Sequence, residues 1–209
     1  MNIRTKQLVL TALLTAISLV FGLTVLGYIP IGPIQITIMC VPVIIGTILL
    51  GLKSGLFLGV VFAFTSVMQI FIYPNPLYGV LFVDFLSWCK ILIVCIVPRL
   101  LVPVTVFYVN KAINTRANRK NGTFGWILSS AAGSLTNTVF FLGLFWLLFS
   151  ATASGLSSDM YAIYMSMFTI ASTVNAGSEI IFCCIVCPAV IFALNKAFFA
   201  KKPAKENGK

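Results

Sequence analysis

The chain has 209 residues, of which 60% are hydrophobic and 9% are charged, and it contains 14 basic residues, 4 acidic residues and no histidine. A soluble domain carries about 25% charged residues, so this composition excludes a soluble globular protein and a disordered chain. It also disfavours an enzyme, because no histidine and few carboxylates are present for acid–base chemistry. The class that remains is an integral membrane protein.

Six apolar segments are predicted to span the membrane, since about 20 mostly apolar residues cross the hydrocarbon. The first continues as a full span without a small-residue cleavage site, so we interpret it as a helix rather than a signal peptide. The second and third are joined only by LKSG and form a tight hairpin, and Pro98 and Pro103 break the second half of the fourth. In chain order the six segments are residues 8–27, 38–52, 55–73, 79–109, 124–149 and 165–198.

All basic residues except Lys90 and Arg99 lie in segments that a six-span chain places on one side of the membrane. The loops on the other side hold a single charge, Asp159. The positive-inside rule then places both termini in the cytoplasm. The predicted fold is an all-α integral membrane protein whose six transmembrane helices lie within residues 1–199, followed by a disordered basic cytoplasmic tail at 200–209. The charge of +10 reports this topology, and we expect no nucleic-acid binding.

Six cysteines are present, and all of them fall within the predicted spans. The run CCIVC places Cys183 and Cys187 on one helix face, which would suit a soft metal ion. Packing as small apolar residues is the favoured interpretation, because no histidine or second thiol pair completes a site. We therefore expect no metal, cofactor or catalytic residue.

Four ionisable residues lie inside the apolar spans, apart from Lys196 near the end of the sixth, and a charge there is costly and usually marks function. They are Asp84, Lys90, Arg99 and Glu179. Asp84 lies toward the outer side, on one helix face with Trp88 and Arg99, while Lys90 is near mid-membrane and points elsewhere. Arg99 comes close to the cytoplasmic surface and is expected to snorkel there or to face a partner.

Amide groups add to these charges at about the middle of the membrane. Asn137 lies in the fifth span, and Asn175 precedes Glu179 by one helical turn in the sixth. Apolar walls with a few convergent polar groups are typical of a small-molecule pocket. Hydrogen bonding between helices and a Lys90–Glu179 ion pair remain alternative roles for these side chains.

The loop after the first span reads GYIPIGPIQIT. It has no charge and two prolines, so we expect an extended or turn-like segment that folds over a pocket as a lid. In the first span, Ala12 and Ala16 form a pair of small residues that lets another helix approach, either within the chain or from a partner. No Walker motif is present, so the chain cannot hydrolyse ATP by itself.

These segments resemble the substrate-binding S components of energy-coupling factor (ECF) transporters. The resemblance covers nearly the whole chain, in TALLTA, IPIGPIQITIMCVPVIIGTILLGLKSG, VPRLLVPVTVFYV, GSLTNTVFFLGLFWLLF and NAGSEIIFCCIVCPAVIFAL. It implies a six-helix bundle in the bacterial cytoplasmic membrane that binds one water-soluble vitamin in an outward-facing pocket. It also implies a membrane T component with two cytoplasmic ATPases as partners, and a toppling motion on docking that releases the substrate inside.

The resemblance further implies roles for particular residues. Ala12 and Ala16 would contact the T component, and the first loop would be the gate, with Tyr28, Pro30, Gly32 and Pro33 as its residues. The ligand contacts carried over from the family are Gln35, Trp88, Asn137, Asn175 and Glu179. Asp84 and Lys90 are added as substrate-binding residues because of their place in the fourth span.

The substrate is harder to predict than the family. The first-loop pattern is similar to the branch that includes the pantothenate and folate S components, although Cys40 stands where many relatives have histidine. Pantothenate is ranked first, since Lys90 or Arg99 can pair with its carboxylate and asparagines suit its amide. Riboflavin and folate follow, with Trp88 and Tyr28 available for stacking on riboflavin. A secondary transporter and a small membrane enzyme are the alternatives from other classes.

Overall fold

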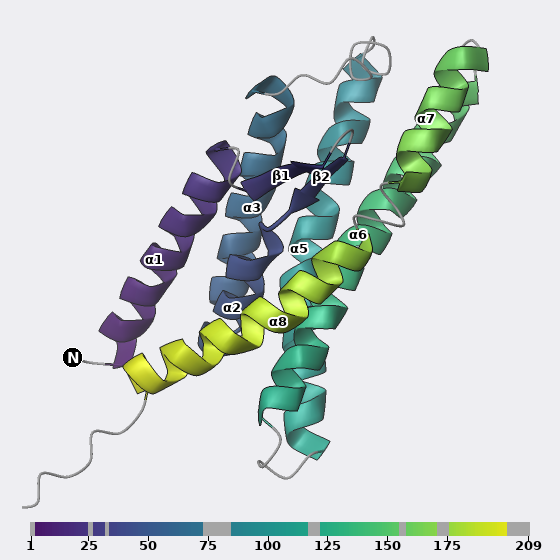
Figure 1. Cartoon of the computed structure of the whole chain (residues 1–209). Coiled ribbons are helices and arrows are strands. Elements are labelled where there is room, and N and C mark those ends of the chain that lie inside the picture. Colours follow the sequence, from purple (N-terminus) through teal and green to yellow (C-terminus); the bar gives the residue numbers. More distant parts are fainter. Residues whose placement is uncertain are drawn as a thin grey trace, which may run out of the picture.

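The computed structural model describes residues 3–24, 27–31, 34–72, 85–116, 122–154, 158–170 and 176–199. Its long helices form a bundle (Figure 1). A two-stranded hairpin follows the first helix in the sequence and precedes the second. The elements are α1 (Ile3–Leu23), β1 (Tyr28–Ile31), β2 (Ile34–Thr37), α2 (Cys40–Leu50), α3 (Leu52–Ile72), α5 (Phe85–Arg116), α6 (Gly122–Ser154), α7 (Ser158–Ile170), α8 (Ala176–Leu194) and a final π-helical turn η3 (Asn195–Phe199).

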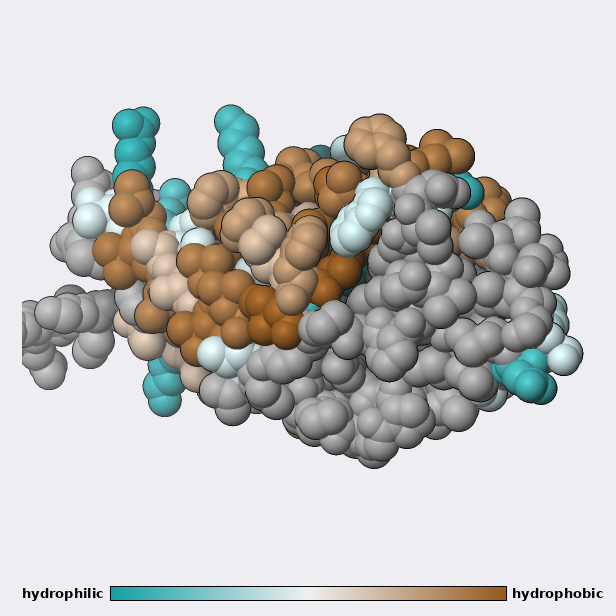
Figure 2. All heavy atoms as spheres, turned by 90° about the horizontal axis from the view of Figure 1, so that it is seen from above, coloured by the Kyte–Doolittle hydropathy of each residue, from teal (hydrophilic) through white to brown (hydrophobic). Residues whose placement is uncertain are grey.

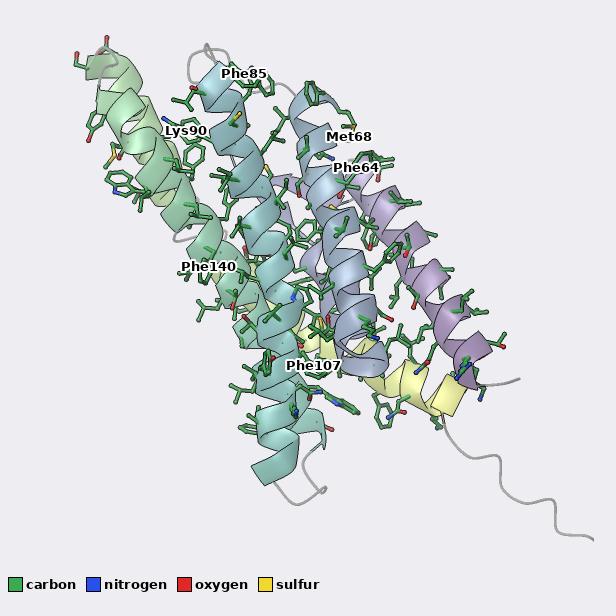
Figure 3. All side chains as sticks on the ribbon, turned by 180° about the vertical axis from the view of Figure 1, so that it is seen from behind. Phe64, Met68, Phe85, Lys90, Phe107 and Phe140 are labelled. Carbon is green, nitrogen blue, oxygen red and sulfur yellow. The ribbon has the colours of Figure 1, made fainter. Side chains whose placement is uncertain are left out.

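Five of the described helices, α1, α3, α5, α6 and α8, are long and apolar enough to cross a membrane. Large apolar side chains such as Phe64 and Phe140, labelled in Figure 3, are more than 40% exposed on the outside of this bundle. Figure 2 shows the same feature as a broad brown surface with hydrophilic side chains at its margins. Such a surface is stable against lipid and not against water, so the chain is a multi-pass membrane protein.

The second predicted span is a short helix rather than a full crossing. α2 has 11 residues, which gives a length of about 16 Å in a hydrocarbon layer of about 30 Å. It is surrounded by α1, α3, α5, α6 and α8, and every residue from Cys40 to Thr47 is buried. The predicted tight hairpin with α3 is confirmed. It needs only Gly51, whose positive φ of 90° suits glycine, because Leu52 already begins α3.

The loop after α1 is extended, as predicted, and forms an antiparallel hairpin. Tyr28 pairs with Thr37 and Pro30 with Gln35 in its register. The N–H of Ile38 donates to the carbonyl of Gly27 over 3.0 Å, which closes the open end of the hairpin immediately before α2. Two of the predicted gate residues, Gly32 and Pro33, lie outside the described residues.

The predicted break in the fourth span is wrong, because α5 runs unbroken through Pro98 and Pro103. Each proline removes the N–H that would bond to the carbonyl four residues earlier. The carbonyl of Val94, freed by Pro98, accepts a hydrogen bond from Nη1 of Arg99 at 3.2 Å. The carbonyl of Arg99, freed by Pro103, lies against Gly59 of α3, where a side chain would leave no room. Side-chain and packing contacts therefore keep the helix intact in lipid.

The predicted boundaries at the end of the chain also need correction. The segment 165–198 was expected to be one span, but α7 ends at Ile170 and α8 begins at Ala176. The segment 151–164 was expected to be a loop, yet α6 continues to Ser154 and α7 begins at Ser158. Because this stretch is apolar and nearly uncharged, composition alone does not separate its helices from the span that follows.

The ends of the helices that carry the basic residues gather at one end of the bundle. α1 begins, α8 ends and α5 connects to α6 at the lower end of Figure 1. Arg4, Lys6, Lys111 and Lys196 belong to these ends. Their placement agrees with the charge distribution expected for one membrane face, while the assignment of that face to the cytoplasm remains a prediction. The predicted tail, 200–209, lies outside the described residues.

Candidate functional site

A buried carboxylate lies where α2, α6 and α8 meet. Glu179, in the first turn of α8, is only 3% exposed. Its Oε1 accepts from Sγ of Cys40 at 3.0 Å and from Nδ2 of Asn137 at 3.4 Å, and its Oε2 accepts from Oγ1 of Thr138 at 3.2 Å. Cys40 is also the first residue of α2, so the carboxylate lies at two helix N-termini, where a negative charge is stabilised. We call Cys40, Asn137, Thr138 and Glu179 the Glu179 cluster.

Close packing of α6 brings Asn137 into this cluster. Gly133 precedes Asn137 by one turn on the same helix face, and both residues are buried. A Cβ atom at Gly133 would collide with Val106 of α5 and press on Ile44 of α2. Gly133 therefore lets α6 approach α2 and α5 closely enough for the amide of Asn137 to reach Glu179.

Arg99 is buried within the bundle, which contradicts the expectation that it snorkels to the surface. The residue is 7% exposed, and its guanidinium carbon lies 5.2 Å from the ring centre of Phe62 and 4.6 Å from that of Phe141. Phe141 follows Asn137 by one turn of α6. The guanidinium is therefore close to the Glu179 cluster.

The hydrogen bonding of Arg99 is incomplete within the described residues. Its hydrogen bond goes to the Val94 carbonyl, and no described acidic side chain forms an ion pair with it. Its Nε is buried without a partner, as is Oδ1 of Asn137. Buried polar atoms without partners are costly, so a cationic donor and an amide acceptor lack partners among the described residues.

Lys90 and Trp88 lie apart from the Glu179 cluster, on the part of α5 nearer its beginning. Lys90 points from α5 toward α6 (Figure 3), where its ammonium is 6.0 Å from the ring centre of Phe149. Trp88 stacks on Phe71 with ring centres 5.7 Å apart. No ion pair joins Lys90 to Glu179 in the described structure, so that alternative for satisfying both charges is not realised.

The other predicted residues are placed as follows. Gln35 lies in β2, a strand that contacts α8, whereas Asp84 and Asn175 fall outside the described residues. Ala12 and Ala16 are both exposed on α1, and Cys183 and Cys187 lie in the main hydrophobic core. Among the predicted ligand contacts whose side chains the structure describes, Asn137 and Glu179 are brought together, whereas Trp88 and Lys90 lie elsewhere on α5.

Sequence reasoning did not reveal the contacts of Cys40 and Thr138 with Glu179, nor the burial of Arg99, although it offered Arg99 as a partner for a carboxylate. For the burial of Arg99 a signal was available, because the helical spacing places it on one face with Cys95, a residue type that packs in apolar cores. For Cys40 no local signal exists, since its contact with Glu179 joins residues 139 positions apart.

Comparison with known proteins decides the family. Residues 6–191 match the family described as "ECF transporter, substrate-specific component". The chain belongs to this family. It is also 31% identical over 174 residues to the pantothenic acid transporter PanT of Lactococcus lactis subsp. cremoris (strain MG1363), with 79% of this chain and 80% of the relative aligned. As an S component, the chain is a substrate-binding subunit of a vitamin transporter and not an enzyme, and the family in general works with T and ATPase partners.

Proposed function

We propose that this S component binds pantothenate. The observation that carries the proposal is Arg99, a buried guanidinium with an unpartnered Nε and no ion pair to a described acidic residue. A buried cation without a counter-ion is unfavourable, and the carboxylate of a ligand would provide that counter-ion through charge-assisted hydrogen bonds. Pantothenate is such an anion, whereas riboflavin is neutral at the same pH.

The polar groups near Arg99 suit the rest of the molecule. Pantothenate has one amide and two hydroxyl groups, which need acceptors as well as donors. The unpartnered Oδ1 of Asn137 is one acceptor. The carboxylate of Glu179 is a second, although it already accepts hydrogen bonds from Cys40, Asn137 and Thr138. The 31% identical relative named as a pantothenic acid transporter supports pantothenate over folate, the other anionic candidate.

The transport steps of the proposal follow from the family resemblance. The hairpin of β1 and β2 acts as the gate, with Gln35, Asp84, Trp88, Lys90 and Asn175 as further candidate contacts. The loaded S component docks on a T component with two ATPases and topples to release the vitamin on the cytoplasmic side of a bacterial membrane. The exposed faces of Ala12 and Ala16 on α1 are consistent with a docking surface.

The substrate is tested on the purified chain in detergent by isothermal titration with pantothenate, riboflavin and folate, each alone. We expect saturable one-to-one binding of pantothenate, and no binding of the other two at the same concentrations. Mass spectrometry of protein purified from rich medium should find pantothenate co-eluting. Tighter binding of riboflavin or folate, or binding of none of the three, contradicts the proposal.

Replacing Ala12 or Ala16 with tryptophan should abolish uptake while leaving pantothenate affinity within about twofold, because a bulky side chain on an exposed face blocks helix approach and not the buried site. The measurement is uptake of labelled pantothenate in cells that contain the T and ATPase subunits, paired with titration of each purified variant. Leu13→Ala, on the same exposed side of α1, is the control that changes this face without adding bulk, and it should retain uptake. A loss of affinity in the Ala12 variant would show that the face supports the bundle instead.

A further inference from the structure

Arg99 and Pro98 are neighbours in α5, and their contacts are linked. Pro98 has no N–H, so the carbonyl of Val94 loses its helical donor. Nη1 of Arg99 supplies a donor to that same carbonyl at 3.2 Å. A carbonyl without a hydrogen bond is strongly disfavoured inside a membrane bundle, so this contact gives the guanidinium one preferred position.

The contact also selects which edge of the guanidinium remains available. The rings of Phe62 and Phe141 hold the group from α3 and α6, but rings alone leave a planar ion free to turn. The bond from Nη1 to Val94 removes that freedom and leaves the opposite edge, which contains the unpartnered Nε, without a protein acceptor in the described structure. An edge of two parallel N–H groups is the one that binds a carboxylate in bidentate fashion.

We propose that Pro98 is a positioning residue for anion recognition: by freeing the Val94 carbonyl, it provides the acceptor that orients Arg99 and presents its Nε edge to the carboxylate of the substrate. The inference rests on the proposed function, since it assumes a carboxylate ligand at Arg99. Pro98 itself is buried and touches no ligand in this scheme. Pro98 contributes because it has no backbone N–H, which leaves the Val94 carbonyl free to accept from Arg99.

Pro103, five residues after Pro98 in α5, is a matched control. Pro103 is also buried and also frees a carbonyl, that of Arg99, but this carbonyl faces Gly59 of α3 and not a guanidinium. Replacing either proline with alanine restores one helical N–H. Only the replacement of Pro98 gives the Val94 carbonyl a competing donor and releases the orientation of Arg99.

The test measures the affinities of Pro98→Ala, Pro103→Ala and the unchanged chain for pantothenate and for pantothenol, the neutral alcohol in which the carboxylate is replaced. We expect Pro98→Ala to weaken pantothenate binding about tenfold, the scale of one lost interaction with a charged group. Pantothenol binding should change by less than about twofold, and Pro103→Ala should leave both affinities close to those of the unchanged chain. Combined with Arg99→Gln, Pro98→Ala should add no further loss.

The outcomes separate this inference from the proposed function. If the unchanged chain does not bind pantothenate, the proposed function fails. If it binds pantothenate but Pro98→Ala leaves the affinity unchanged, or weakens both ligands equally, Pro98 has no positioning role. Thermal unfolding of each variant in detergent checks the fold. If Pro98→Ala does not fold, Pro98→Gly restores the same N–H without a side chain and decides the question by the same comparison.

Discussion

Arg99→Gln should weaken pantothenate binding about a hundredfold, since truncating one partner of a desolvated charge pair typically costs 2–5 kcal/mol. Arg99 is 7% exposed and held between two aromatic rings, so little solvent screens an anion bound beside it. Glutamine keeps a similar length and polarity but removes the charge. Titration of the purified variants with pantothenate measures the effect, and the neutral alcohol pantothenol should lose far less affinity.

Two further variants test the chemistry of this result. Arg99→Lys keeps the charge but lacks the planar pair of N–H groups, so we expect a loss between those of the unchanged chain and Arg99→Gln. Lys90→Gln removes the other cation of α5, which lies beside Phe149 and is a candidate contact outside the Glu179 cluster, and we expect it to lose less affinity than Arg99→Gln. If Lys90→Gln lost much pantothenate affinity and Arg99→Gln lost little, the carboxylate of the ligand would bind at Lys90, which the sequence analysis named as a substrate-binding residue.

Lys90 and Arg99 both lie in an apolar span, but only Arg99 is enclosed between aromatic rings, and this difference shows what a sequence can and cannot predict in a membrane protein. Apolar length and charge bias identify a multi-pass bundle, because lipid imposes both on every span. The same rules assign a residue to a face and a depth. They do not reveal that the rings of Phe62 and Phe141 enclose Arg99, because these rings come from helices packed beside α5 and not from neighbouring turns.

The prolines and the Glu179 cluster illustrate the same limit. Pro98 predicts a break by local rules, but the neighbouring Arg99 satisfies the freed carbonyl and the helix continues. Asn137 and Glu179 were recognised individually as buried polar groups. Their contact, and the contribution of Cys40 from the start of α2, depend on the close approach of α6 at Gly133. Such packing is decided by shape complementarity between distant segments, which a periodic pattern does not encode.

Glu179→Ala should lower the free energy of unfolding by about 3 kcal/mol, because it leaves buried donors of the Glu179 cluster without their acceptor. The donors are Sγ of Cys40, Nδ2 of Asn137 and Oγ1 of Thr138. Glu179→Gln keeps one acceptor oxygen and should cost less than half as much as the alanine variant. Thermal and denaturant unfolding in one detergent, without ligand, measures both variants.

The two threonines that flank Asn137 provide the internal control for this cluster. Thr138 donates to Glu179, whereas Oγ1 of Thr136 donates to the carbonyl of Ala132 in its own helix at 2.7 Å. Both residues are half-buried on α6, and valine has nearly the shape of threonine. We expect Thr138→Val to cost about 1 kcal/mol and Thr136→Val close to none, since only the first removes a hydrogen bond between helices to a charged acceptor. In Glu179→Ala the difference between the two threonine variants should disappear, because the acceptor that distinguishes them is gone. If the two threonine variants still differed in unfolding free energy in the Glu179→Ala background, Thr138 would stabilise the fold through a contact other than Glu179.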